Sequence, residues 1–318
     1  MIRLGFQVNN WGELATGPFA LKTAQRAEAL GYDSVVVTDH VVIPHRVESP
    51  YPYSPTGRLA VPPEWDYLEA LSLLAFLAGA TKTIRLGPSV LVLPYRNPVL
   101  TAKMLATMDA LSGGRLFVGV GVGWMAEEFA VLGSPPYEHR GGVADEWIRI
   151  FKALWTEERA SFEGRFYRFP EVGCFPKPVQ KPHPPIWVGG NSRPAIRRAA
   201  RLGDGWHAVR VPAGELRGLC GYLREQVAAS GRAPGDCALT VLYGIRVVGP
   251  GGDATRRPTE EDPEKVFVGT AAQVAEQIRP VLDFGPTDVI FHCRTGSGAE
   301  VLETMERLAG EVWPRLVK

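Results

Sequence analysis

Cysteine is scarce in this chain and follows no pattern. Four cysteines occur among 318 residues, and they lie apart, without a CxxC pair or a neighbouring histidine cluster, at Cys174, Cys220, Cys237 and Cys293. This spacing argues against a disulfide framework and against a zinc site, so we expect no metal. It is typical of reduced thiols in a cytoplasmic protein.

Excess charge and long apolar runs are also missing. The chain has 35 basic and 34 acidic residues, a net charge of +1, so we expect neither a nucleic-acid nor a membrane partner. The most apolar predicted helix, LEALSLLAFLAGA at 68–80, is too short to span a bilayer and carries Glu69. Met1 runs almost directly into the strand-like IRLGFQV, so no signal peptide is expected. These features predict a soluble protein of the cytoplasm.

The chain does contain one alternation of strand and helix that repeats from end to end. Eight runs of mostly unbroken apolar residues read as strands buried on both faces, and helical patterns separate them. They are IRLGFQV (2–8), SVVVTDH (34–40), IRLGPSVLVL (84–93), RLFVGVG (115–121), PIWVGG (185–190), GWHAV (205–209), ALTVLYGIRVV (238–248) and TDVIFHC (287–293).

Eight such units predict an α/β protein, a single (β/α)8 TIM barrel over residues 1–318. A doubly wound open sheet is the alternative, but it usually has fewer units and a G-x-G-x-x-G opening. We expect insertions after strands 2 and 4 and near strand 7. Residues 41–66 are rich in Pro and Tyr, and the pattern of 157–184 predicts a hairpin within that segment. Long ordered loops of this kind usually form lids or binding loops.

The active site of such a barrel lies at the C-terminal ends of its strands. No strand there ends in an H-x-H pair or an acid cluster, no lysine lies near a strand end, and no Cys or Ser has a motif-like base partner. The chemistry is therefore expected to belong to an organic cofactor. The residues at the predicted strand ends are Asp39, His40, Ser89, Val90, Gly121, Gly123, Trp124, Gly189, Gly190, Asn191, Ser192, His207, Arg246, His292 and Arg294.

Two glycine clusters suggest that this cofactor carries a phosphate. VGVGVGWMAEEF (118–129) and WVGGNSRPAIRRAA (187–200) each place small residues where a strand opens towards a helix. Bare N–H groups at a helix N-terminus bind anions, and glycine lets a phosphate approach closely. The competing interpretation is that the glycines only relieve crowding at βα turns.

Five motifs in order resemble the luciferase-like monooxygenase superfamily. They are AEALGYDSVVVTDH, IRLGPSVLVLPYRNPV, LSGGRLFVGVGVGW, PPIWVGG and RRAARLGDGW, and they cover nearly the whole chain. The likeness is greatest to the oxidoreductases that use coenzyme F420, a deazaflavin. Enzymes that use flavin mononucleotide (FMN) share most of these motifs. The resemblance implies a (β/α)8 barrel with insertions and a homodimer.

The resemblance also implies roles for individual residues. His40 matches the catalytic position that faces the reacting carbon, and Trp124 walls the substrate pocket. Family members that oxidise sugar phosphates carry a glutamate where this chain has Trp124, which argues against that substrate class. Ser89–Val90 matches a cis peptide behind the ring. The positions that match cofactor-binding residues are Asp39, Ser89, Val90, Val122, Gly123, Gly189, Gly190, Asn191 and Ser192.

The function that these residues predict is hydride transfer between coenzyme F420 and a small organic substrate. His40 would take or supply the accompanying proton, because imidazole exchanges protons near neutral pH. The alternatives are an FMN-dependent monooxygenase, a flavin-binding protein without catalysis and a cofactor-free barrel hydrolase.

Overall fold

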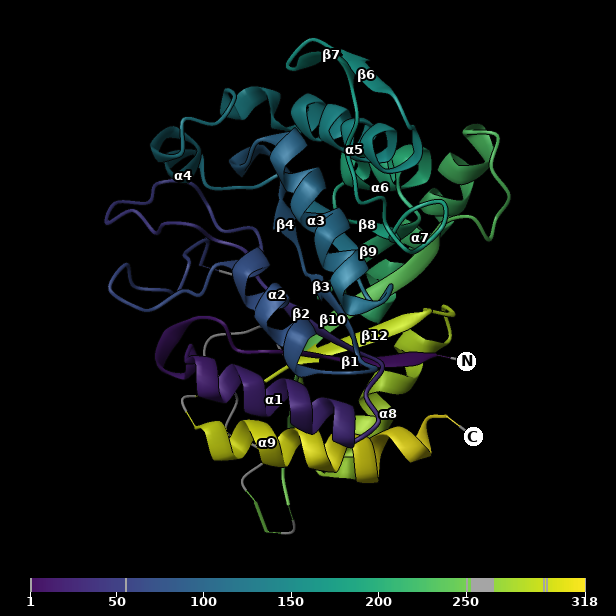
Figure 1. Ribbon diagram of the computed structural model, residues 1–318. Coiled ribbons are helices and arrows are strands. Elements are labelled where there is room, and N and C mark those ends of the chain that lie inside the picture. Colours follow the sequence, from purple (N-terminus) through teal and green to yellow (C-terminus); the bar gives the residue numbers. More distant parts are fainter. Residues whose placement is uncertain are drawn as a thin grey trace.

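A ring of parallel strands forms the centre of the molecule (Figure 1). The computed structural model describes residues 2–54, 56–249, 251–252, 266–293, 295 and 297–317. The sheet order is β3-β2-β1-β12-β10-β9-β8-β5-β4. The ring closes because β3 and β4 are two parts of one extended stretch, with β3 paired to β2 and β4 paired to β5. The predicted α/β barrel is confirmed.

All eight predicted strands are present. The third is interrupted after Pro88 and resumes at Leu91. The ring consists of β1 (Arg3–Gln7), β2 (Ser34–Val37), β3 (Arg85–Pro88), β4 (Leu91–Val92), β5 (Val118–Gly121), β8 (Ile186–Gly189), β9 (Gly205–Val209), β10 (Ala238–Val247) and β12 (Asp288–His292).

Helices surround the ring and bury their apolar faces against it. Five of them (α1, α2, α3, α6 and α9) start with a side-chain cap, which satisfies a backbone N–H group that has no partner within the helix. Thr270 and Gln273 form the capping box expected from their spacing. The helices are α1 (Gly17–Ala29), α2 (Ala70–Ala80), α3 (Pro98–Ser112), α4 (Ala126–Val131), α5 (Arg140–Thr156), α6 (Arg193–Leu202), α7 (Ala213–Ala229), α8 (Ala271–Leu282) and α9 (Gly298–Arg307).

The insertions follow β2 and β5. The first contains loop 41–66, which lies beside α4 in Figure 1. The second contains α4, α5 and the predicted hairpin, β6 (Ala160–Glu163) with β7 (Arg168–Val172). The expected insertion near strand 7 falls largely on residues outside the described part of the chain. It is followed by β11 (Val266–Gly269), a strand that the sequence reading missed and that extends the pairing of β10.

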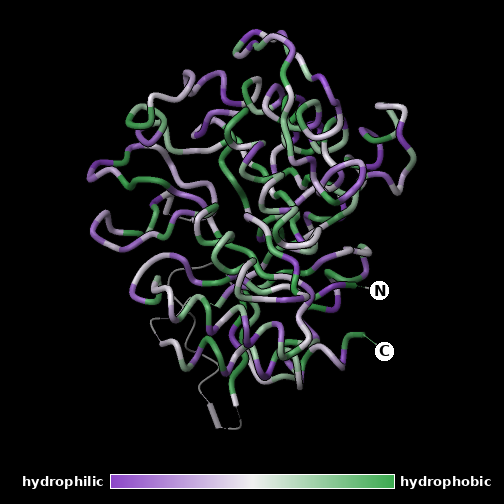
Figure 2. The backbone as a smooth tube through the Cα atoms, viewed as in Figure 1, coloured by the Kyte–Doolittle hydropathy of each residue, from purple (hydrophilic) through white to green (hydrophobic). Residues whose placement is uncertain are grey.

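The N-terminal end of the barrel is filled and closed. Side chains of four strands and of Phe117, which directly precedes β5, pack into one apolar cluster there, and Figure 2 shows hydrophobic segments, drawn green, through the interior of the molecule. Beneath them the fully buried carboxylate of Asp288 accepts hydrogen bonds from Arg3 at 2.9 and 2.8 Å and from Arg85 at 3.1 Å. Buried charges need such pairing. A ligand therefore has to enter from the opposite end. The packed residues are Val36, Phe117, Trp187, Leu242 and Ile290.

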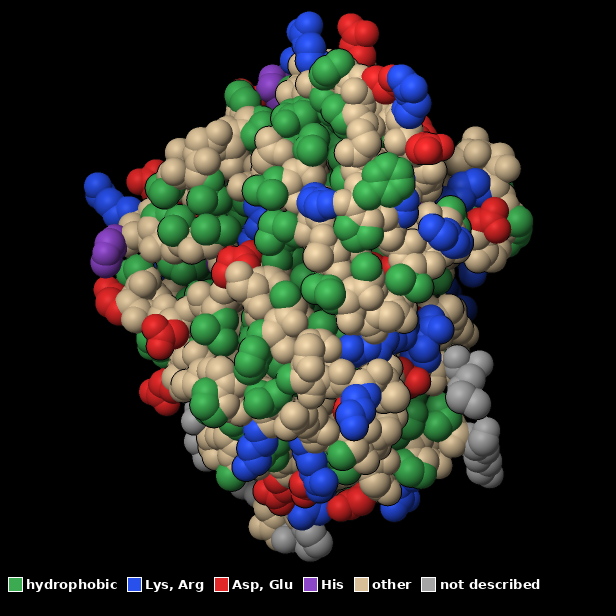
Figure 3. Space-filling view, in the orientation of Figure 1, with side chains coloured by type: hydrophobic (Ala, Val, Ile, Leu, Met, Phe, Trp, Pro, Cys, Tyr) green, Lys and Arg blue, Asp and Glu red, His purple; other side chains and the backbone are tan. Residues whose placement is uncertain are grey.

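The surface agrees with a chain of balanced charge. On the face drawn in Figure 3, basic and acidic side chains are interspersed among apolar ones and form no large field of one sign. Within the described ranges, no helix has the length and apolarity needed to cross a membrane.

Candidate active site

A cavity of about 910 Å³ lies at the C-terminal ends of the strands. It is within the size range of small-molecule sites. Five of the predicted site residues line it together, although they follow three different strands: Asp39, His40, Ser89, Val90 and Trp124. Loop 41–66 supplies much of the remaining wall, as expected for a binding loop. The other lining residues are Trp11, Thr38, Tyr51, Tyr53, Ser54, Thr56, Arg58, Leu59, Ala60, Val61, Tyr67, Val92 and Arg210.

His40 is oriented by a buried carboxylate. Its Nδ1 lies 2.6 Å from Oε2 of Glu128, whose side chain is completely buried in α4. The other oxygen of Glu128 accepts hydrogen bonds from the backbone N–H groups of Val41 at 2.7 Å and Val42 at 3.2 Å. The rings of Tyr67 and Trp124 pack edge-on against the imidazole. One carboxylate thus fixes both the histidine and the start of the loop.

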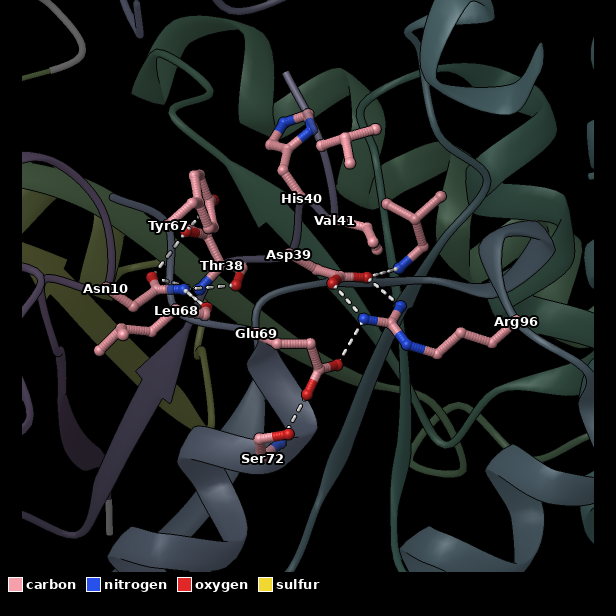
Figure 4. A network of polar contacts seen from close by, with 12 residues as sticks. Asn10, Thr38, Asp39, His40, Val41, Tyr67, Leu68, Glu69, Ser72 and Arg96 are labelled. Carbon is pink, nitrogen blue, oxygen red and sulfur yellow. Dashed lines mark hydrogen bonds and ion pairs between the residues drawn. The ribbon is translucent and has the colours of Figure 1, made fainter. Parts of the chain in front are cut away.

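Asp39 has a different environment from its neighbour (Figure 4). Arg96 donates to both of its oxygens at 2.7 Å, and the N–H of Val92 donates to Oδ2 at 2.8 Å. Arg96 also donates to Glu69 at 2.6 Å. Burial acts against the charge of Arg96, but the hydrogen bonds that Arg96 donates to the Asp39 and Glu69 carboxylates, and their charges, outweigh it and raise the pKa of the guanidinium. The Asp39 carboxylate therefore joins the end of β2 to β4.

The β2 end is held on its other side by Asn10. The Asn10 amide donates to the carbonyls of Thr38 at 2.8 Å and Leu68 at 3.1 Å, and its oxygen accepts from the N–H of Thr38 at 3.1 Å. Figure 4 shows this network and the Asp39–Arg96 pair on either side of the segment that leads to His40. The backbone before His40 is thereby fixed from both sides.

The Ser89–Val90 peptide bond is cis, as the resemblance implies. Val90 lies against neighbouring glycines: a Cβ on Gly121 would come within 2.5 Å of Val90 Cγ2, and one on Gly189 within 2.6 Å of Val90 Cγ1. Ser89 Oγ lies 2.8 Å from Nε2 of His207. Close approach of Val90 is thus one reason why these two strand ends carry glycine.

His207 has a structural environment. It is buried, and its Nδ1 lies 2.8 Å from the hydroxyl of Thr240. Burial lowers the pKa of His207 to about 4, with the charge of Asp288 acting weakly in the other direction. His207 is therefore neutral at pH 7.

The predicted phosphate turn lies beside the cavity and does not appear in its lining. Gly190 has a φ of 113°, a conformation that glycine tolerates. The Asn191 amide donates to the carbonyl of Val209 at 2.7 Å and accepts from its N–H at 3.1 Å, which joins the ends of β8 and β9. Ser192 caps α6 by accepting from the N–H of Ala195 at 3.4 Å. The turn therefore has backbone N–H groups at the start of α6, while the side chains of Asn191 and Ser192 form hydrogen bonds within the protein.

Val122 and Gly123 lie between β5 and α4, outside the cavity lining. Gly123 has a φ of 81°, and a Cβ there would come within 2.6 Å of Phe129 and 2.8 Å of Val92. Val122 packs partly against the main core. Packing therefore accounts for Gly123 without a ligand.

The charged partners of His40 and Asp39, which are Glu128 and Arg96, were missed from the sequence. Consecutive acids in the first turn of a helix, just before the buried Phe129, were the available signal for Glu128. Glu127 also holds the loop, because its Oε1 accepts from the N–H groups of Glu48 at 2.7 Å and Ser49 at 3.0 Å. Partial burial opposes the charge, yet these donors lower the pKa of Glu127.

Comparison with known proteins identifies a matching family model and related oxidoreductases. A family model described as luciferase-like monooxygenase matches residues 6–258. The F420-dependent glucose-6-phosphate dehydrogenase of Kineococcus radiotolerans is 31% identical over 244 residues, 76% of this chain and 66% of that protein. The FMNH(2)-dependent dimethylsulfone monooxygenase of Pseudomonas putida is 38% identical over 168 residues, 52% of this chain and 46% of that protein.

Solved structures share the fold. An F420-dependent secondary alcohol dehydrogenase, in complex with an F420–acetone adduct, superposes with a TM-score of 0.80 at 19% identity, covering 100% of this chain and 99% of the other. At this identity the likeness is evidence for the barrel alone.

Proposed function

This chain belongs to the luciferase-like monooxygenase family, and from that premise we propose that it is an oxidoreductase that transfers a hydride between coenzyme F420 and a small organic substrate. The observation that carries the proposal is the His40–Glu128 pair at the cavity. A histidine held by a buried carboxylate is an arrangement suited to proton transfer.

The cavity fits a flat aromatic cofactor. Ser89 and Val90 form one wall, and the rings of Tyr67 and Trp124 form others. When bound, the deazaflavin supplies a carbon that accepts or gives up a hydride. We assign the backbone of Gly189 to Ser192, at the start of α6, to the phosphate.

His40 would accept or donate the proton that accompanies the hydride. Because an ionised carboxylate can only accept, we assign the Nδ1 proton to the contact with Glu128, which would leave the Nε2 atom of His40 to exchange a proton with the substrate. Asp39 would act through its backbone, because Arg96 and Val92 already donate to its carboxylate. Trp124 would shape the substrate pocket and exclude water from it.

Replacement of His40 tests the proposal. His40→Ala should lower turnover roughly 10²–10⁴-fold, because the proton then has no carrier, and should leave the Kd of F420 nearly unchanged. The assay follows deazaflavin absorbance, without oxygen, over a panel of alcohols, aldehydes and enones.

His45→Ala is the matched control for this test. His45 lies five residues further on, in loop 41–66, with a side chain that is 83% exposed, and its removal should leave turnover at the parent level. Unaltered turnover of His40→Ala with saturating substrate would refute the role of His40.

FMN is the competing cofactor, since the Pseudomonas putida relative is FMNH(2)-dependent. A monooxygenase would use reduced FMN to activate oxygen, whereas a deazaflavin reacts poorly with oxygen. We further propose that residues 1–318 form a single barrel domain that works as a homodimer in the cytoplasm, which light scattering of the purified protein and cell fractionation would test.

A further inference from the structure

Three polar side chains form a hydrogen-bonded row that starts at the cavity. Oγ of Ser89 lies 2.8 Å from Nε2 of His207, and Nδ1 of His207 lies 2.8 Å from Oγ1 of Thr240. Ser89 belongs to the cavity lining, whereas His207 and Thr240 are almost completely buried. Apolar side chains could fill the same space without the cost of burying polar groups. Packing alone therefore does not account for this polar row.

Neighbouring groups hold the polar row in one geometry. The backbone N–H of Ser89 donates to the carbonyl of Val37 at 2.8 Å, which fixes the position of the serine against β2. The ring of Trp187 stacks against the imidazole of His207, with the centroids 6.2 Å apart and the planes 22° apart. The Ser89 hydroxyl therefore has a fixed partner on the protein side, and its remaining capacity for hydrogen bonds is left for the cavity.

The protonation of His207 gives the direction of these hydrogen bonds. Burial lowers the pKa of His207 to about 4, so at pH 7 the ring is neutral and carries a single N–H. The Thr240 hydroxyl has a second neighbour, the carbonyl of Trp206 at 3.5 Å, which can only accept. Because the hydroxyl has one proton and donates it there, Thr240 accepts from Nδ1–H of His207. The Nε2 atom is then the acceptor for the Ser89 hydroxyl.

This direction determines what Ser89 offers to a ligand. A serine hydroxyl has one proton and two acceptor sites. Once the proton is donated to His207, the oxygen of Ser89 can only accept a hydrogen bond from the cavity. A ligand that places an N–H or O–H group against Ser89 is stabilised, whereas a ligand that places a lone pair there leaves two acceptors facing each other without a proton.

We propose that Ser89, oriented by His207, is a fixed hydrogen-bond acceptor that favours the reduced form of the cofactor over the oxidised form. Two-electron reduction of a deazaflavin or a flavin adds an N–H group to the ring, and hydrogen bonds to ring nitrogens are one means by which proteins tune such cofactors. Ser89 accepts from this N–H group, and His207 is the positioning residue. The identity of the ligand rests on the proposed function, whereas the direction of the hydrogen bonds does not.

The test is calorimetric titration of the full-length protein, without oxygen, with oxidised F420 and with reduced F420. The ratio of the two Kd values is compared between the parent and Ser89→Ala. Loss of the acceptor should lower the preference for reduced F420 about fivefold, the effect of one hydrogen bond. The same titrations with oxidised and reduced FMN, whose ring also gains an N–H group, make the result independent of which of the two cofactors the protein uses.

Two substitutions of His207 test its positioning role. In His207→Phe the Ser89 hydroxyl can turn its proton into the cavity, so the preference for the reduced cofactor should fall as it does in Ser89→Ala. In His207→Gln the amide oxygen can accept from Ser89, so the preference should be retained. Ser112→Ala is the control, because it removes a buried hydroxyl that donates to the carbonyl of Asp109, outside the cavity lining, and it should leave the ratio unchanged.

Nitrogen NMR of histidine-labelled protein without cofactor measures the tautomer directly, whether or not the variants fold. Nε2 of His207, assigned by its absence from the spectrum of His207→Gln, should have the chemical shift of an unprotonated ring nitrogen at pH 7. Three results would overturn the proposal: a protonated Nε2, an unchanged or increased preference for the reduced cofactor in Ser89→Ala, and a preference that survives His207→Phe. The predicted ratios in a protein that transfers no hydride to or from a substrate would refute the proposed function alone.

Discussion

His40 and Glu128 lie 88 positions apart in the sequence and 2.6 Å apart in the fold. The strand-end position of His40 could be read from the sequence, because an apolar run stops just before it. Its partner could not, because the contact depends on the rotation of α4 and on the path of the loop that α4 holds. Local periodicity determines neither.

Glu128→Gln should lower kcat roughly ten- to a hundredfold with little change in KM. The amide keeps the shape of the side chain but loses the charge that orients the imidazole and stabilises its protonated form. Steady-state kinetics at saturating F420 would measure both parameters.

Glu127→Gln is the adjacent control. Glu127 accepts from two backbone N–H groups of the loop, as Glu128 does, but neither of these two bonds involves His40. Its variant should keep kcat within a few-fold of the parent. Equal losses in the two variants would mean that Glu128 acts only by anchoring the loop.

His207 should make the protein sensitive to acid. With a pKa of about 4 when folded and 6.5 when unfolded, it binds fewer protons in the folded state between these values. The free energy of unfolding should therefore fall as the pH drops from about 6.5 to about 4, by about 3 kcal/mol at 1.4 kcal/mol per unit.

His207→Gln should remove most of this dependence while keeping hydrogen-bonding groups near Ser89 and Thr240. Urea unfolding at pH 7 and pH 4.5 would measure it. If parent and variant lost the same stability between these values, another group would be responsible.

At the scale of elements, the third strand departs most from its prediction. The run 84–93 reads as one strand, yet it is divided into β3 and β4 at Ser89–Val90. An apolar run has the same residue pattern whether or not the strand is interrupted. The break was therefore implied by the family resemblance and not by the pattern. Neighbouring glycines in β5 and β8, which suggested a phosphate, also make room for this segment.

Gly119→Ala should therefore destabilise the barrel. The new Cβ would lie 2.2 Å from the carbonyl oxygen of Pro88, a backbone atom that cannot move aside cheaply. Overpacking of this kind costs about 1–3 kcal/mol, and thermal unfolding would measure the loss.

Gly79→Ala is the matched change in an open position. Gly79 lies on the exposed side of α2 with no heavy atom within 4 Å of its added Cβ. Alanine there should stabilise the helix by about 0.5–1 kcal/mol. If Gly119→Ala were as harmless as this control, close packing against β3 would not explain the glycine.

At the scale of the whole molecule, the sequence predicted the barrel because each buried strand carries its own signal. β11 escaped prediction, and its pairing with Gly244 to Val247 is a tertiary feature that the local residue pattern does not encode. The cavity was predicted by position, at the strand ends, and its lining by loop 41–66 agrees. The identity of its lining residues depends on the path of that loop, which only the fold provides.

Titration of the apoprotein with F420 and with FMN, followed by oxygen uptake of each reduced complex in the presence of substrate, tests the central claim most directly. The account predicts tight binding of F420, hydride transfer to or from the substrate, and no oxygen uptake coupled to it. Tight binding of FMN, none of F420, and oxygen uptake that depends on substrate would contradict it and assign the protein to the monooxygenases.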